Sequence, residues 1–149
     1  MTTGIELVRP PALSASAPYA YAAVTDPGRM VFTAGACPLD ADGATVAVGD
    51  VAGQARQVMA NLTTALEAAG AGLGDVLKTT VHVATADRAD LLAAWQVVRE
   101  AFGEHEAPST LVGVTVLGYP DQLVEVEAVA VRDSWQEPGP PRDADQLTS

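Results

Sequence analysis

The sequence predicts an α+β fold in which two helices cover one face of a single sheet. Residues 50–70 and 85–103 carry apolar side chains at the three-to-four-residue spacing of amphipathic helices. The segments with the β-branched residues or the alternation of strands are residues 29–35, 76–84, 111–117 and 123–132. Because helices lie between strand segments along the chain, both are expected to pack on one sheet.

Each predicted helix has start and stop signals. Asp50 is a suitable N-cap for the first, and Gly70 or Gly72 a suitable stop. Its apolar stripe is Ala55, Val58, Met59, Leu62, Ala65, Leu66 and Ala69. The second helix has the acidic Asp87 in its opening turn, which the helix dipole favours, and ends at Gly103. Its apolar stripe is Leu91, Leu92, Trp95, Val98 and Phe102.

The best candidate for chemistry lies in residues 106–132, where two strand-like runs flank the turn sequence at 118–121. This turn favours a β-hairpin. In the second run Glu125 and Glu127 alternate with valines, so both carboxylates project from one face. Carboxylates in a mostly apolar strand are costly to bury unless they are solvated or paired. They either face water on the outside of the sheet or belong to a site.

The ends of the chain differ from its centre. A short strand is expected at residues 5–8 within an otherwise loose lead-in. Residues 1–133 are expected to form one domain with a sizeable core. Residues 134–149 are rich in proline and poor in hydrophobic side chains, which predicts a disordered tail.

Charge and hydropathy exclude several classes of partner. The formal net charge is −11, and the eight Lys and Arg residues are spread thinly, so nucleic acid and anionic membrane surfaces are not expected partners. No apolar run approaches the roughly 20 residues that cross a bilayer, and no signal peptide is evident. A single cysteine, Cys37, agrees with a reducing compartment. The expected location is the cytoplasm.

Metal-binding patterns are absent from the sequence. Residues 40–43 lack the remaining ligands of a calcium loop, which favours a plain turn. His82 has no second ligand at metal spacing, and His105 follows a helix as a turn residue. Cys37 lies between Ala36 and Pro38 and is interpreted as a small core residue rather than a nucleophile.

Five segments carry a resemblance to a known family. They are APYAYA (17–22), MVFTAGACPLD (30–40), the block at 54–83, AFGEHEAP (101–108) and VEVEAVAV (124–131). In this order and spacing, from about residue 17 to 132, the chain resembles the Rid or YjgF-like reactive-intermediate deaminases. The resemblance implies a chorismate-mutase-like subunit with a single mixed sheet and two helices on one face. It also implies a homotrimer with a cleft at each subunit interface.

The resemblance implies a chemistry as well. Well-studied members hydrolyse enamines and imines, such as 2-aminoacrylate and 2-iminopropanoate, to a keto acid and ammonia without cofactor or metal. Glu125 matches the glutamate that positions the attacking water, and Glu127 matches its partner. Tyr19 matches the aromatic residue near the cleft, and Gly35 matches a glycine whose backbone lines the pocket.

One family residue is missing. Where the family has Pro-Ala-Arg-Thr or Pro-Ala-Arg-Ser, this chain has Ala-Pro-Ser-Thr, so Ser109 stands at the arginine position and Thr110 follows it. The family's arginine binds the substrate carboxylate, and serine cannot form that bidentate, charge-assisted pair. The pocket therefore suits a neutral or larger apolar substrate, with hydrogen bonds from Ser109 or Thr110.

Three functions follow from these residues. The first is a divergent deaminase for an imine, enamine or related C–N compound without a free carboxylate. The second is a trimer that binds a small metabolite or acts in regulation without catalysis. The third is an endoribonuclease activity like that of some relatives, which the charge of −11 disfavours.

Overall fold

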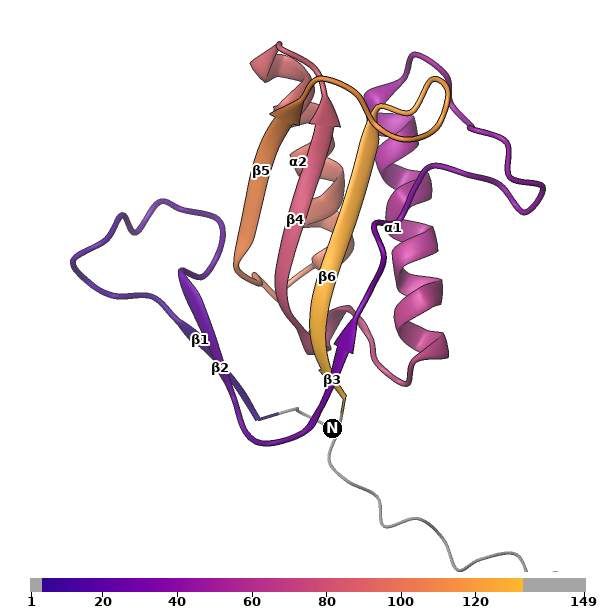
Figure 1. Cartoon of the computed structure of the whole chain (residues 1–149). Helices are drawn as coiled ribbons and strands as arrows, with labels where there is room; N and C mark the ends of the chain where they lie inside the picture. Colours follow the sequence, from indigo (N-terminus) through magenta and orange to yellow (C-terminus); the bar gives the residue numbers. More distant parts are fainter. Residues whose placement is uncertain (1–3, 133–149) are drawn as a thin grey trace, which may run out of the picture.

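The structure is a computed structural model, and it describes residues 4–132. Its elements are β1 (Ile5–Val8), β2 (Ala22–Thr25), β3 (Arg29–Phe32), α1 (Val51–Ala68), a 3₁₀ turn (Leu73–Asp75), β4 (Val76–Ala84), α2 (Arg88–Phe102), β5 (Ser109–Val114) and β6 (Val124–Arg132) (Figure 1). Neither helix of this region is long and apolar enough to cross a membrane. The predicted tail at 134–149 lies outside the described residues.

The strands form two sheets rather than one. A four-stranded mixed sheet has the order β3-β6-β4-β5, in which only β4 and β5 run parallel. The strands β1 and β2 form a separate antiparallel hairpin beside it (Figure 1). The short strand predicted at residues 5–8 is present, whereas β2 was not predicted.

The hairpin predicted from the turn at 118–121 is wrong. β5 and β6 do not pair with each other, because β4 lies between them and bonds to both. An interior strand needs partners for the backbone groups on both its edges, and β4, with Val81 and Val83 fully buried, is interior together with β6. The segment between β5 and β6 therefore passes over the end of β4 (Figure 1).

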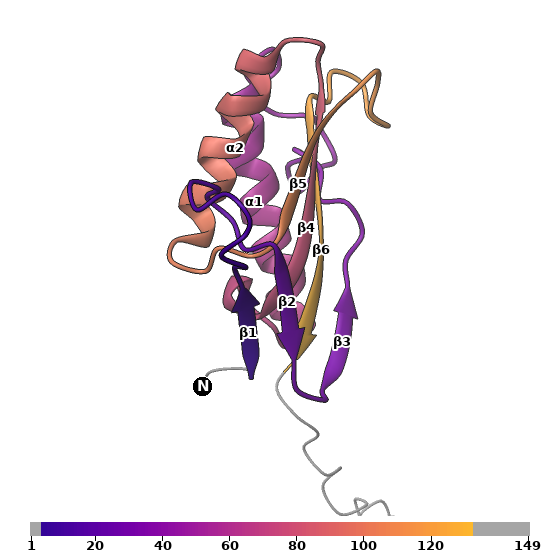
Figure 2. The ribbon, with the colours of Figure 1, turned by 90° about the vertical axis from the view of Figure 1, so that its left-hand side faces the viewer.

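Both helices pack on the same face of the four-stranded sheet (Figure 2). Their starts agree with the sequence, since Asp50 accepts a bond from the Gly53 amide at 3.0 Å and Asp87 one from Ala89 at 2.9 Å. Gly103 ends α2 with a φ of 63°, which favours glycine. The core between helices and sheet includes Val58, Leu62, Leu66, Val98, Val124 and Val126.

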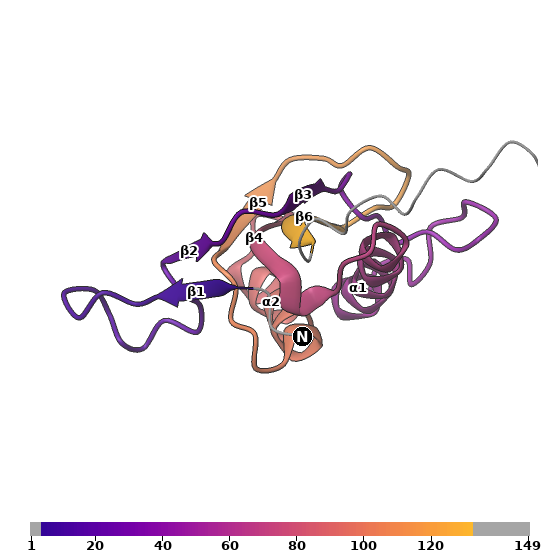
Figure 3. The same cartoon turned by 90° about the horizontal axis from the view of Figure 1, so that it is seen from below.

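The opposite face of the four-stranded sheet is open in the single chain. It carries Phe32, 74% exposed, and Glu127, which is also exposed. Glu127 lies 3.7 Å from His82 of the neighbouring strand. No described helix covers this face (Figures 2 and 3). That a second copy covers it stays a prediction.

Candidate functional site

Glu125 lies directly against the backbone of Gly35. A Cβ atom at position 35 would come within 2.6 Å of both the Cδ and Oε1 atoms of Glu125. Real Cβ atoms do not approach other atoms so closely, so a larger residue at position 35 would displace the carboxylate. The structure therefore brings together two of the residues named from the sequence, on β6 and on the segment after β3.

The segment after β3 pairs irregularly with β6, and this pairing places Gly35 against Glu125. The Thr33 amide donates to the Ala128 carbonyl at 3.0 Å, and the Ala36 amide donates to the Val126 carbonyl at 2.8 Å. Three residue steps on this segment thus match two on β6, as in a β-bulge. The extra residue lies where Gly35 meets Glu125. Bulges change the direction of side chains and backbone, and this bulge places the Gly35 backbone beside the Glu125 carboxylate.

Cys37 is a third member of this group. Its Sγ atom lies 3.3 Å from Glu125 Oε1, in donor geometry. Burial, reinforced by the hydrogen bond and negative charge of Glu125, raises the pKa of the Cys37 thiol to about 11. The thiol is therefore protonated near neutral pH, which agrees with the prediction that it is no nucleophile. The prediction that it is a core residue is wrong, because the side chain is half-buried beside Glu125. The contact itself was not predicted, because the two residues are 88 positions apart.

This contact predicts how Cys37 reacts with iodoacetamide. Since only the thiolate reacts, alkylation of the wild-type protein should be slow at pH 8 and rise with pH towards about 11. Glu125→Gln removes the negative charge, so its thiol should have a lower pKa and react faster at pH 8. The measurement is the alkylation rate against pH by mass spectrometry. Equal profiles for both proteins would contradict the contact.

A second group of residues surrounds an open cavity of about 500 Å³ at the β5 edge of the sheet. The lining residues are Pro18, Tyr19, Trp95, Ser109, Thr110 and Leu111. They come from the loop before β2, from α2 and from β5. The volume falls within the roughly 300–1,000 Å³ of small-molecule sites. The structure thus joins Tyr19, Ser109 and Thr110 and adds Trp95, which the sequence placed only in a core stripe.

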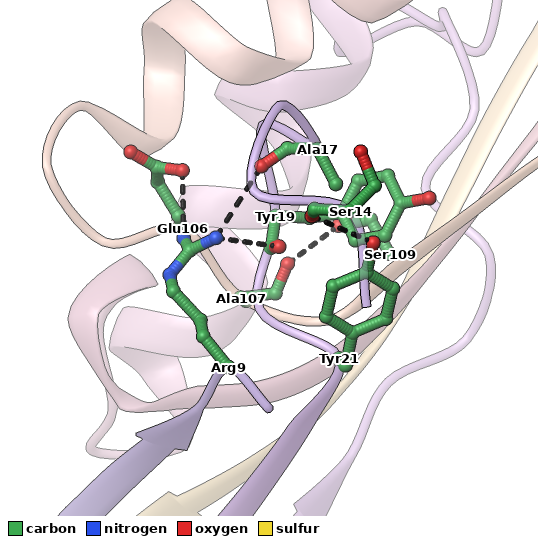
Figure 4. A network of polar contacts seen from close by, with 8 residues as sticks. All are labelled: Arg9, Ser14, Ala17, Tyr19, Tyr21, Glu106, Ala107 and Ser109. Atoms are coloured by element: carbon green, nitrogen blue, oxygen red, sulfur yellow. Dashed lines mark hydrogen bonds and ion pairs between the residues drawn. The ribbon is translucent and has the colours of Figure 1, made fainter. Parts of the chain in front are cut away.

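Arg9 holds the loop that carries Tyr19 (Figure 4). Its guanidinium donates to the carbonyl of Tyr19 at 2.8 Å and to that of Ala17 at 3.3 Å. It also forms an ion pair with Glu106 Oε2 at 2.8 Å. The Ala20 amide adds a bond to the Glu106 carbonyl at 2.9 Å. These contacts connect the loop to the segment that leads into β5. Arg9 and Glu106 therefore both hold the part of the cavity wall that carries Tyr19.

Ser109 and Glu125 lie on opposite faces of the sheet. The Ser109 hydroxyl shares a hydrogen bond of 2.8 Å with that of Thr79, which is fully buried on the helix side. Glu125 is paired in register with His82, three residues further along β4. Because side chains alternate along a strand, Ser109 and Glu125 point to different faces. One chain therefore unites its predicted catalytic glutamate with Gly35 but not with Tyr19 and Ser109.

The remaining site residues lie on the open face. Thr110 contacts the Lys78 ammonium through its hydroxyl, although it also borders the cavity at the sheet edge. Glu127 projects on the same face as Glu125, as the alternation predicted. Within residues 4–132, no group of three His, Cys, Asp or Glu side chains is placed to hold a metal ion.

The mixed sheet with two helices on one face is an α+β fold of the YjgF-like type. Comparison with known proteins gives the family. Residues 10–132 match the family described as Endoribonuclease L-PSP, to which the Rid and YjgF proteins belong. The chain belongs to this family, as the resemblance indicated.

Named relatives are similar over most of the chain. A 2-iminobutanoate/2-iminopropanoate deaminase of Salmonella typhimurium is 40% identical over 114 residues, covering 75% of this chain and 87% of the relative. The 3-aminoacrylate deaminase RutC of Acinetobacter baylyi is 39% identical over 114 residues, covering 76% and 86%. The crystal structure of the Rid protein YyfB from Yersinia pestis superposes with a TM-score of 0.79 at 30% identity, covering 86% of this chain and 98% of that one.

Proposed function

We propose that this protein hydrolyses a reactive imine or enamine that has no free carboxylate, in clefts that neighbouring copies complete. The observation that carries the proposal is the division of the site into two groups. Glu125 against Gly35 forms a catalytic half, and the uncharged cavity beside Ser109 forms a binding half. Relatives that are named deaminases support the reaction class.

A symmetric assembly brings the catalytic half and the binding half together, which one chain does not do. Each copy presents a catalytic half on one face of its sheet and a binding half at the β5 edge. In a closed ring, the catalytic half of one copy meets the binding half of the next, and every site is equivalent. Phe32, 74% exposed on the open face, would be covered by such contacts. We propose a homotrimer, the smallest ring beyond a dimer.

The chemical step needs one carboxylate and one water. The Glu125 carboxylate accepts a proton from water while the water oxygen attacks the imine carbon. The nitrogen takes up the proton that Glu125 received, which gives a carbinolamine. The proton of its new hydroxyl group then passes to the nitrogen as the C–N bond breaks, so a carbonyl product and ammonia leave. Oxygen comes from water and no electron acceptor is required, so no cofactor is needed. The wall formed by Gly35 limits the directions from which water reaches the carboxylate.

The binding half favours a neutral substrate. Its six lining residues carry no charge, and Ser109 stands where the family resemblance implies a carboxylate-binding arginine. A buried carboxylate without a partner is strongly disfavoured. Small anions and nucleic acid are therefore poor ligands, the latter also because of the net charge of −11. The single cysteine supports a cytoplasmic reaction.

The proposal is tested by an imine-trapping assay with a mass measurement. Imines are generated by an amine oxidase or an amino-acid oxidase, and semicarbazide traps those that persist. We expect this protein to suppress trapping of carboxylate-free imines more than of 2-iminopropanoate, and to sediment at three times its 15.3 kDa chain mass. Saturable ligand binding without turnover of any imine would support the non-catalytic alternative. RNA cleavage lost in Glu125→Ala would support the endoribonuclease alternative.

A further inference from the structure

We infer that the cavity beside Ser109 is a subsite for a planar aromatic group of the substrate, with Trp95 as its specificity-determining residue. This inference rests on the proposed function and narrows its substrate class. The absence of an arginine accounts for the lack of charge in this cavity but not for the aromatic side chains that line it.

Tyr19 and Trp95 form a corner of the cavity. Their ring centroids are 6.5 Å apart and the rings are inclined by 82°. Tyr21 packs edge to face on Tyr19 at 5.7 Å and 70°. Aromatic rings favour such T-shaped contacts and offset stacking, because the ring face is negative and the edge positive. A third ring entering the corner can present its face to one of the two lining rings and its edge to the other.

The corner is held in place before a ligand binds. The Tyr21 hydroxyl donates to the Ser14 carbonyl at 2.9 Å, and Arg9 holds the Tyr19 backbone (Figure 4). Trp95 packs against the core from the middle of α2. Binding therefore requires little further ordering of side chains, which lowers its entropic cost.

The rest of the lining suits an apolar ring. Pro18 and Leu111 add apolar surface, and the Ser109 hydroxyl is already bonded to Thr79 and to the Ala107 carbonyl at 3.0 Å. A carboxylate placed here would lose water without finding a cation in the lining, because the Lys78 ammonium lies on the open face, where it donates to the Thr110 hydroxyl. Apolar area removed from water instead stabilises a bound ring.

Neighbouring arginines do not change this conclusion. Arg9 is bound by Glu106 and two carbonyls. Arg99 lines a separate cavity beside Ser109, but that cavity has a volume of only about 10 Å³. This is about the space of one water molecule and too little for a carboxylate. The 500 Å³ cavity, in contrast, accommodates a ring with a short side chain.

Calorimetric titration of the full-length protein tests the subsite with three product-like ketones. Acetophenone has a ring and no carboxylate, 2-butanone has neither, and pyruvate has a carboxylate and no ring. We expect acetophenone to bind at least tenfold more tightly than either of the others. Trp95→Ala should weaken acetophenone about tenfold or more, and Trp95→Phe should restore most of the affinity. Leu92→Ala, on an exposed part of the same helix, is the matched control and should not change it.

The outcomes separate this inference from the proposed function. Pyruvate binding as tightly as acetophenone, or undiminished acetophenone binding in a folded Trp95→Ala protein, would overturn the aromatic subsite even if imines are hydrolysed. If Trp95→Ala and Trp95→Phe both keep the wild-type circular dichroism spectrum and both lose acetophenone binding, the stacking role of Trp95 would be overturned. Trp95 would then only fill space in the cavity. Tryptophan-dependent acetophenone binding without hydrolysis of any imine would leave the subsite standing and refute the deaminase proposal.

Discussion

Glu125→Gln is expected to lower the rate of imine hydrolysis by about 10²- to 10⁴-fold, the usual contribution of a positioned general base. Glutamine keeps the size of the side chain that packs on Gly35 but cannot accept a proton from water. Substrate affinity should change little, because in the proposed cleft the cavity beside Ser109 binds the substrate and Glu125 contacts the attacking water. The measurement is turnover in the trapping assay, with ligand affinity measured separately.

A matched control separates chemistry from folding. Glu67→Gln removes the same charge from an exposed position on α1 and should retain full activity. Both variants should unfold at nearly the wild-type temperature. If Glu125→Gln retained activity within a few-fold of wild type, the water-activating role of this carboxylate would be wrong.

Ser109→Arg is expected to tighten binding of 2-iminopropanoate by about two to three decades. Removing one partner from a buried guanidinium–carboxylate pair costs about 2–5 kcal/mol, and the arginine variant restores that partner. Position 109 borders the binding cavity, so the new side chain can reach a ligand there. Ser109→Lys supplies the same charge without the planar fork and should gain less. Steady-state kinetics on 2-iminopropanoate measures both.

The same substitution should reduce stability. It removes the hydroxyl bonded to Thr79, whose own hydroxyl is buried. An unsatisfied buried hydroxyl costs about 1–3 kcal/mol, which a denaturant titration would detect. If wild type hydrolysed 2-iminopropanoate as fast as Ser109→Arg did, another residue would anchor the carboxylate, and the preference for neutral substrates would be wrong.

Local patterns predicted the local parts of the fold. The two helices and the cap at Asp50 follow from apolar spacing and cap chemistry within a few residues. Asp87, which was expected in the first turn of the second helix, is its N-cap. The pairing of β5 and β6 failed because it depends on β4, which comes earlier in the chain and takes the place between them. β2 was missed because four residues, alternately exposed and half-buried, give a weak signal.

The candidate site divides in a similar way. Alternation placed Glu125 and Glu127 on one face, and the family resemblance singled out Tyr19, Gly35 and Ser109. Sequence patterns could not show that Cys37 donates to Glu125, since the contact depends on a bulge between distant segments. Trp95 was not predicted as a site residue, because a tryptophan in an apolar helical stripe is expected in the core. Only its contact with Tyr19 reveals that it borders a cavity.

The central claim is that each active cleft takes Glu125 from one copy and the aromatic cavity from another. The direct test mixes Glu125→Gln with a Tyr19→Ala, Trp95→Ala double variant, each nearly inactive alone, by co-expression with different tags. In a trimeric ring that contains both variants, one of the three clefts combines two intact halves, so activity should return to about a third of wild type. Purified mixed assemblies that stay as inactive as their parents would show that each chain holds its own site and would contradict this account.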